Sequence, residues 1–450
     1  MNSTFLSSAI FYCFNLFFIY KLWFWRHNAM NIEILSTGNE LTTGALADTN
    51  AAFISECLTQ NHMIVNRHHA VSDDLSLIST VLSEISHRAD ILIVTGGLGP
   101  TSDDLTAEAA SKAINKSLVF NQSAYDAMCD FFDRIQRPMN ESNKKQAYLP
   151  DGAEPIPNPV GTATGFKLFM DRCYAYFLPG VPHEMKKMLT TYVLPDINQI
   201  FSDLKQKTGH QTIVCFGPSE SAMGDTIKDI PLLIKGVQVG TRSMFPELQI
   251  KLYATDESIE KIESLLEQAE KICMDRLGKY IVSTKGESIQ QVVGNLLRER
   301  NASLAVAESC TGGLIAHKIT DVPGSSDYFL CSAVTYANDL KINMLNVSSE
   351  TIQKYGAVSQ ETVMEMAEGI RKKTNAHYCL ATSGIAGPGG GTSEKPVGTL
   401  CMAVSYDSDI QSQKIVLPFG NRKQKKELFA MAALDMLRRK ILHLPFLFEE

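Results

Sequence analysis

Short apolar segments alternate with longer amphipathic segments from residue 32 onward. The pattern predicts strands at residues 32–35, 62–66 and 91–94 and helices at 50–58 and 75–87. Strands and helices in this order pack into a parallel sheet with helices on both faces. Ligands of such sheets bind beyond the carboxyl ends of the strands. We therefore predict an α/β domain with its binding site at that edge.

A glycine-rich segment, TGGLGPTSDDLT, follows the third predicted strand at residues 95–106. Its glycines Gly96, Gly97 and Gly99 allow the backbone to approach a phosphate closely. Asp103 and Asp104 offer the oxygen ligands that a divalent metal such as Mg²⁺ binds. Either aspartate also belongs to a residue type that caps helices, so a purely structural role stays open.

A second strand–turn–helix pattern, SLAVAESCTGGLIAH, occupies residues 303–317. Residues 304–307 predict a strand, and apolar residues at helical spacing follow the turn. A glycine-containing turn of this kind directs free N–H groups toward one point, which suits an anion or a developing oxyanion. The turn holds two candidate nucleophiles, Ser309 and Cys310. An ordinary capped connection is the alternative.

Tyr336 and Lys341 lie downstream, in the segment TYANDLK. Asn338 is a good N-cap, which would place Lys341 in the first turn of a helix and Tyr336 before it. The helix dipole and desolvation lower the pKa of an amine at that position and make it a better base. A serine–lysine pair with a tyrosine as proton relay is a workable amidase apparatus. A solvated lysine beside a half-buried tyrosine is the alternative.

A predicted helix at 361–372 and a strand at 377–382 lead into another glycine-rich segment, SGIAGPGGG, at 383–391. So many glycines prevent regular structure and allow close approach of a ligand to the backbone. We predict that this loop cradles the phosphate or ribose of a nucleotide, with Thr392 supplying a further hydroxyl. The residues concerned are Ser383, Gly384, Gly387, Gly389 and Gly390. A flexible surface hairpin is the alternative.

Several motifs in the last third of the chain carry a family resemblance. They are AESCTGGLIAHKITDVPGSSDYF, AVTYANDLKINMLNV, YGAVSQETV, ATSGIAGPGGGTSEKPVGT and FGNRKQ, in this order. From about residue 287 onward, the chain resembles the C-terminal domain of the competence/damage-inducible CinA family, a nicotinamide-nucleotide amidase of the PncC type. The resemblance implies that Ser309 is the nucleophile and that Tyr336 and Lys341 activate it, and it argues against Cys310.

The same resemblance implies a reaction. The expected substrate is nicotinamide mononucleotide, whose carboxamide would be hydrolysed to nicotinate mononucleotide and ammonia without a cofactor. N–H groups of Thr311, Gly312 and Gly313 are expected to hold the oxyanion. Arg422 is a candidate phosphate ligand by its place in the family, although its sequence context alone shows only a basic helix start.

The N-terminal half resembles a different fold family. TGGLGPTSDDLT, with TGNELTTGALADTN, NPVGTATGF and PGVPHEM, resembles the MoaB/MogA-like molybdopterin-binding fold of CinA proteins. The functionally important aspartate of the D-x-T element maps to Asp104. The resemblance implies ADP-ribose pyrophosphatase activity with a divalent metal such as Mg²⁺ at Asp103 and Asp104. A retained nucleotide-binding fold with little turnover is the alternative, and molybdopterin binding is a further one.

The chain of 450 residues is long enough for about three domains. We predict an apolar leader at 1–29, a molybdopterin-binding-like α/β domain at 30–200, a small α+β domain at 201–285 and an α/β amidase domain at 286–450. In the middle domain we expect strands at 211–216 and 247–253 and helices at 220–227 and 258–277. It contains no catalytic cluster, so we expect a spacer or a dimerisation element in a homodimer.

Charge and cysteine spacing limit the partners and the compartment. The net charge of −7 gives no electrostatic reason to expect nucleic acid as a partner. The ten cysteines form no C-x-x-C pair, which fits reduced thiols in the cytoplasm. The aromatic-rich leader is short for the ~30 Å hydrocarbon core of a bilayer. It is either an over-long start or an anchor, and membrane contact is expected only if it is an anchor.

The overall prediction is a nicotinamide mononucleotide deamidase of pyridine nucleotide salvage, with ADP-ribose pyrophosphatase activity as a second expectation. Its partners would be these small nucleotides. Two alternatives stay open: a metal-dependent ADP-ribose pyrophosphatase only, and a non-catalytic, competence-associated nucleotide-binding protein.

Overall fold

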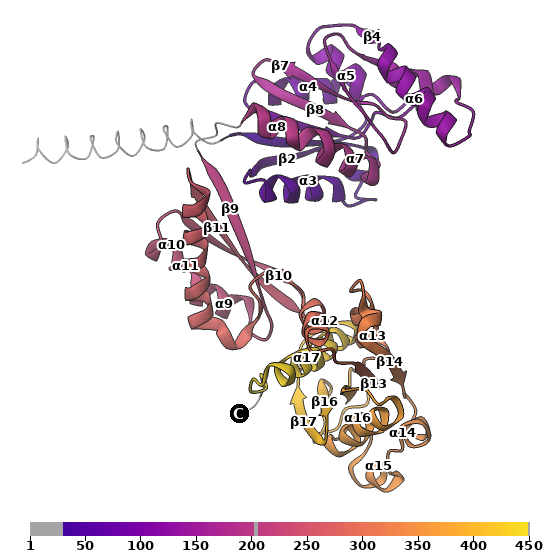
Figure 1. Ribbon diagram of the computed structural model, residues 1–450, viewed down its shortest axis with the longest axis vertical. Helices are drawn as coiled ribbons and strands as arrows, with labels where there is room; N and C mark the ends of the chain where they lie inside the picture. Colours follow the sequence, from indigo (N-terminus) through magenta and orange to yellow (C-terminus); the bar gives the residue numbers. More distant parts are fainter. Residues whose placement is uncertain (1–29, 202–205, 449–450) are drawn as a thin grey trace, which may run out of the picture. The chain divides into compact units, whose positions relative to one another are not determined.

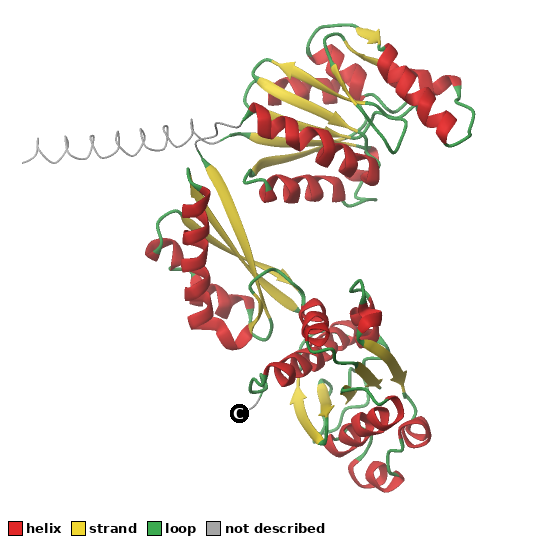
Figure 2. Cartoon of the chain, viewed as in Figure 1, coloured by secondary structure: helices red, strands yellow, loops and turns green. Residues whose placement is uncertain are grey.

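The computed structural model describes residues 30–201 and 206–448. The chain divides into two compact units, one with the residues up to 210 and 254–265, the other with 211–253 and the residues from 266 onward. Figure 1 follows the elements along the chain, and Figure 2 separates helices from strands. The predicted leader at 1–29 lies outside the described residues.

The N-terminal domain is built on a six-stranded sheet of order β2-β1-β3-β8-β7-β6. The strands are β1 (Ile32–Thr37), β2 (Val65–Val71), β3 (Ile91–Thr95), β6 (Glu154–Ile156), β7 (Gly165–Met170) and β8 (Cys173–Leu178). β2, β1, β3 and β8 are parallel, whereas β7 and β6 continue the sheet in antiparallel fashion. The predicted parallel sheet is confirmed, with an antiparallel edge added.

Helices cover both faces of this sheet (Figure 2). α4 (Leu75–Ser86) and α5 (Thr106–Ala113) pack on one face, around Leu82 and Phe177. α3 (Thr49–Gln60), α7 (Pro182–Met188) and α8 (Leu194–Ile200) pack on the other, around Ile34 and Ile54. All six residues of β1 are buried, because a strand covered on both faces has no solvent side.

The second strand was predicted at 62–66, and its predicted first residue is wrong. The chain leaves α3 through a turn in which His62 has a left-handed φ of 63°, so β2 begins only at Val65. β2 continues through the polar sequence NRHHAV. An edge strand with exposed side chains tolerates such residues.

Smaller elements complete the domain. They are α2 (Asn39–Thr42), β4 (Leu118–Phe120), α6 (Gln122–Arg134), η1 (Glu141–Ala147), β5 (Tyr148–Pro150) and η2 (Leu189–Val193).

The middle segment forms a four-stranded sheet of order β10-β11-β9-β12 with helices beside it. Its elements are β9 (Lys207–Cys215), α9 (Glu220–Ile227), α10 (Ile230–Leu233), β10 (Val237–Met244), β11 (Glu247–Asp256), α11 (Ile259–Leu277), η3 (Gly278–Tyr280) and β12 (Ile281–Ser283). The predicted α+β character is confirmed. The sequence pattern missed β10, whose sequence VQVGTRSM has one buried residue and lacks an apolar run.

The C-terminal domain has a five-stranded sheet of order β14-β13-β15-β16-β17. Its strands are β13 (Leu304–Glu308), β14 (Phe329–Val334), β15 (Tyr378–Gly384), β16 (Thr399–Tyr406) and β17 (Asp409–Val416). β13 is central and parallel to both β14 and β15, while β16 and β17 are antiparallel. The carboxyl ends of three parallel strands therefore meet at one edge.

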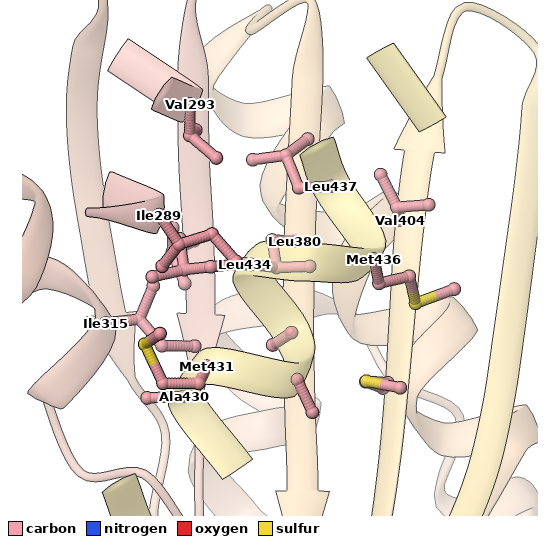
Figure 3. Packing of buried hydrophobic residues seen from close by; sticks show 14 of the residues in the cluster. Ile289, Val293, Ile315, Leu380, Val404, Ala430, Met431, Leu434, Met436 and Leu437 are labelled. Carbon is pink, nitrogen blue, oxygen red and sulfur yellow. The ribbon is translucent and has the colours of Figure 1, made fainter. Parts of the chain in front are cut away.

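Two helical layers enclose this sheet. α12 (Ile289–Glu299), α13 (Leu314–Thr320) and α17 (Arg422–Leu442) share one core with it. In Figure 3, Leu434 and Leu437 of α17 lie among Ile289, Val293 and Leu380. α14 (Asn338–Leu345) and α16 (Gln360–Thr374) pack on the other face, with α15 (Ser349–Tyr355) against α16; η4 (Ser325–Asp327) precedes β14.

Within the ranges 30–201 and 206–448, no helix is both long and apolar enough to span a bilayer.

Candidate active site

Ser309 lies at the carboxyl edge of the C-terminal sheet, directly after β13. Its N–H donates to Thr382 O at 3.0 Å, and Thr335 N–H donates to Glu308 O at 2.9 Å. These two bonds place the ends of β14 and β15 on either side of the serine. Ser309 is 8% exposed, and within the described residues its hydroxyl forms no hydrogen bond.

The buried carboxylate of Glu308 fixes the turn that carries Ser309. It accepts backbone N–H bonds from Gly313 at 2.9 Å, Ile315 at 3.2 Å and Ala316 at 3.0 Å, and a bond from the Ser332 hydroxyl at 3.0 Å. Sequence reasoning assigned Glu308 no role. The signal was available: an acidic residue stands just before a helix start, where an anion is stabilised.

The structure changes the expected oxyanion donors. Gly313 N–H is bound to Glu308 Oε2, and Gly312 N–H donates to Ser309 O at 3.1 Å. Among the residues that the structure describes, the N–H groups of Cys310 and Thr311 donate to no oxygen, and both bond the sulfur of Cys310. The N–H groups of Gly312 and Gly313, which we predicted as oxyanion donors, are engaged in holding the turn closed.

Lys341 is buried beside the same turn, with 1% of its surface exposed. Its Nζ donates to Thr335 O at 2.8 Å and to Tyr336 O at 3.1 Å. Burial lowers the pKa of Lys341, and the nearby Cys310 opposes this weakly. The alternative of a solvated lysine is wrong. The predicted cap is off by one residue, since Asn338 is the first residue of α14 and Ala337 precedes it as N-cap.

Tyr336 lies at the mouth of the site, with 60% of its surface exposed. Its hydroxyl accepts a hydrogen bond from Arg422 Nη2 at 3.1 Å. The fold therefore brings Ser309, Tyr336 and Lys341 to one sheet edge, as predicted. In the described part of the chain, no hydrogen bond joins their side chains directly.

Cys310 is a poor nucleophile in this setting. It is buried, and burial raises the pKa of its thiol to about 12, so the thiol is protonated near neutral pH. Its Sγ lies 3.1 Å from where a Cβ on Gly384 would stand, which shows that the sulfur packs against β15.

The second glycine-rich segment lies beside the site, but not all of it faces a ligand. Ser383 is buried and its hydroxyl donates to Ala357 O at 2.6 Å, so the proton of that hydroxyl is engaged within the protein. Gly387 O accepts from Arg422 Nη1 at 2.6 Å. Gly389 has open space around its Cβ position, and Gly390 has a left-handed φ of 87°. The approach of a ligand is therefore possible at Gly389 and Gly390.

Arg422, predicted as a phosphate ligand, forms two hydrogen bonds within the protein. Its two terminal nitrogens donate to Gly387 O and to Tyr336 Oη. The guanidinium thus connects the glycine-rich segment to the tyrosine with two of its five N–H donors, and three donors remain for a ligand.

The N-terminal domain has a cavity of about 350 Å³ at the carboxyl edge of its sheet. Its walls include all five residues predicted for this site: Gly96, Gly97, Gly99, Asp103 and Asp104. Three further acidic residues line it and were missed, Glu40, Asp73 and Glu184. Glu40 and Glu184 belong to the motifs TGNELTTGALADTN and PGVPHEM, whereas Asp73 lies outside every motif quoted for this domain.

Both predicted aspartates in this cavity contact Thr101. Asp104 Oδ2 accepts from Thr101 N–H at 2.8 Å, and the Thr101 hydroxyl lies close to both carboxylates. The hydrogen bond from Thr101 holds the pKa of Asp103 below its usual value. The helix-cap interpretation is wrong, because Leu105 is the N-cap of α5 and no side chain caps it.

Two other acids of the cavity, Asp73 and Glu184, have raised pKa values. Burial raises the pKa of Asp73, and repulsion from Glu40, Asp103 and Asp104 adds to it. Burial likewise raises the pKa of Glu184 against a hydrogen bond from Asn158. No three His, Cys, Asp or Glu side chains of the described segments are grouped as a metal site. The oxygen donors present still suit Mg²⁺, which binds through one or two carboxylates together with substrate phosphates.

Comparison with known proteins identifies the family. Three family profiles match: the CinA C-terminal domain at 286–441, a probable molybdopterin binding domain at 33–199 and the damage-inducible protein CinA KH domain at 210–283. A CinA-like protein of Desulfosudis oleivorans is 46% identical over 413 residues, which cover 92% of this chain and 100% of that protein. The chain belongs to the CinA family. A CinA-like protein of Desulforapulum autotrophicum is 44% identical over 92% of this chain and 99% of its own.

Solved CinA structures match parts of the chain. A CinA protein of unknown function from Thermoplasma acidophilum is 35% identical, covers 38% of this chain and 99% of its own, and has a TM-score of 0.35. A competence/damage inducible protein from Agrobacterium tumefaciens is 36% identical over 33% of this chain and 91% of its own, with a TM-score of 0.33. The names of these CinA relatives specify no reaction.

Proposed function

We propose that the C-terminal domain hydrolyses the carboxamide of nicotinamide mononucleotide. The observation that carries the proposal is the buried amine of Lys341, with its lowered pKa, at the same strand edge as Ser309. A neutral amine beside a hydroxyl is a competent general base, and the low pKa keeps more of it neutral at a given pH.

In the proposed reaction, Lys341 takes the proton of Ser309 Oγ through the phenol of Tyr336. Arg422 donates to Tyr336 Oη, so the phenol proton remains free to pass to the amine. Ser309 Oγ bonds to the amide carbon, and the N–H groups of Cys310 and Thr311 stabilise the oxyanion. The C–N bond then breaks, the leaving nitrogen receives a proton from Lys341, and ammonia departs. Water hydrolyses the acyl-enzyme to nicotinate mononucleotide and restores Ser309.

Ammonia release from nicotinamide mononucleotide tests this proposal. We expect Ser309→Ala to abolish release, while Ser326→Ala, at an exposed position in η4 at the opposite edge of the sheet, retains it. Equal rates for Ser309→Ala and the unmodified protein would remove the serine from the mechanism.

A second activity is proposed for the N-terminal domain, on the strength of its cavity. A volume of about 350 Å³ lies within the range of small-ligand sites, and three glycines next to acidic side chains suit a metal-bound pyrophosphate. The proposed reaction is hydrolysis of ADP-ribose, with a divalent metal supplying charge stabilisation when bound. AMP release that requires Mg²⁺, stops with EDTA and is lost in Asp104→Ala would support it. No AMP release under any of these conditions would favour a domain that only binds nucleotides.

A further inference from the structure

The first turns of α17 contain four basic side chains, which differ in their contacts. Arg422 is bound to Gly387 O and Tyr336 Oη, and the buried Lys425 donates to Gly420 O. Lys423 is exposed to solvent. Lys426 is half-buried and, among the described residues, has neither an ion pair nor a hydrogen bond.

Lys426 Nζ lies directly over the turn that follows Ser309. It is 3.4 Å from the point where a Cβ on Gly312 would stand. The next residue on the helix, Glu427, is already paired with Lys318 at 2.7 Å and is partly buried with it. An ammonium without a counter-ion is therefore held beside the turn that follows the candidate nucleophile.

We infer that Lys426 binds the phosphate of the substrate and selects a phosphorylated pyridine ribonucleoside over the unphosphorylated one. This inference rests on the proposed amidase function. A partly desolvated ammonium attracts a phosphate dianion strongly, whereas it gains nothing from a neutral ribose. Arg422, which bonds Gly387 O and Tyr336 Oη, acts here as a positioning residue for Tyr336 and the glycine-rich segment.

The residue beneath the lysine has an unusual backbone conformation. Gly312 has a left-handed φ of 60°, and any side chain there would approach Lys426 Nζ. The glycine at this position leaves no side chain between the ammonium and the turn.

Kinetics with two substrates test the inference. The substrates are nicotinamide mononucleotide and nicotinamide riboside, which differ only in the phosphate. For Lys426→Ala we expect kcat/KM with the mononucleotide to fall by about 10- to 100-fold, mainly through KM, and kcat/KM with the riboside to stay within about threefold. Lys426→Arg should retain most of the activity, and Lys423→Ala on the same helix serves as control. Equal losses with both substrates, or no loss with either, would overturn the inference.

A binding measurement separates this inference from the proposed reaction. Titration calorimetry on Ser309→Ala, with and without Lys426→Ala, compares the affinities for the two compounds. We expect the preference for the mononucleotide to disappear with the lysine, even if the unmodified protein releases no ammonia. An unchanged preference would overturn the role of Lys426, and absent ammonia release alone would overturn only the amidase proposal.

Discussion

Lys341 Nζ donates a 2.8 Å hydrogen bond to the backbone oxygen of Thr335, whose own N–H is bonded to Glu308 at the end of β13. Through these two hydrogen bonds, Lys341, the candidate base, is connected to β13, the strand that Ser309 directly follows. It also leaves an amine in a buried place where its pKa is lowered. Five predictions concern this arrangement and its surroundings.

Replacing the amine should remove the base and leave the fold intact. For Lys341→Met we expect kcat for ammonia release to fall by a factor of about 10² to 10⁴, the usual contribution of a general base. Circular dichroism should be unchanged, because methionine fills a similar volume. Retained kcat in a folded Lys341→Met protein would contradict the assignment.

The lowered pKa of Lys341 also predicts how stability depends on pH. Between the folded pKa and the ordinary value of 10.5, the unfolded chain binds more protons at this site than the folded chain. The free energy of unfolding therefore gains a contribution that grows as pH rises through this window. Chemical denaturation at several pH values should show this gain in the unmodified protein and its absence in Lys341→Met. The same slope in both would contradict the pKa direction.

Glu308 should matter for both stability and turnover. Glu308→Gln keeps the shape but turns one acceptor oxygen into a donor, which leaves backbone N–H groups of α13 without a partner. We expect a loss of about 1–3 kcal/mol in the free energy of unfolding and a lower kcat, because the Ser309 turn loosens. Glu299→Gln, at an exposed helix end, is the matched control. An effect no larger than that of the control would show that the turn holds without this carboxylate.

Cys310 should be dispensable for chemistry. Its buried thiol has a pKa of about 12, so we expect Cys310→Ala to keep ammonia release within about fivefold and to cost about 1 kcal/mol of stability. Alkylating reagents should inactivate the protein slowly at neutral pH, because little thiolate is present. Complete loss of activity in a folded Cys310→Ala protein would restore the cysteine as a nucleophile.

Two glycines of one segment should differ in their tolerance of a methyl group. A Cβ on Gly384 would lie 2.6 Å from Thr399 O and 3.1 Å from Cys310 Sγ, whereas Gly389 has nothing within 4 Å. We expect Gly384→Ala to lower the free energy of unfolding by about 1–3 kcal/mol and Gly389→Ala to change it by less than about 0.5 kcal/mol. Thermal denaturation of the two variants decides this, and equal shifts would contradict the packing described for β15.

Much of the fold was predictable because the strands and helices carry strong local periodicity. The predicted helix at 220–227 and the start of the helix at 75–87 coincide with α9 and α4. β10 was missed because a polar edge strand leaves little pattern. The predicted strand at 62–66 started too early because a left-handed turn at His62 is invisible to hydrophobicity.

The sequence was enough to identify residues of the candidate site, but it did not reveal the hydrogen bonds and ion pairs that these residues form. Ser309, Tyr336 and Lys341 were found from local motifs, and the adjacency of β13, β14 and β15 then brings them to one edge. Which N–H groups remain free depends on Glu308, whose carboxylate turns back onto the backbone. Lys426 has no ion pair within the described residues, whereas its neighbour Glu427 on α17 pairs with Lys318 on α13. A contact between two helices cannot be read from a short sequence motif.

The most direct test of the account is the covalent intermediate. Protein quenched with acid during turnover of nicotinamide mononucleotide would be digested and its peptides analysed by mass spectrometry. We expect a nicotinate-mononucleotide ester on Ser309 that is absent from Ser309→Ala. An adduct on Cys310, or continued ammonia release by Ser309→Ala, would contradict it.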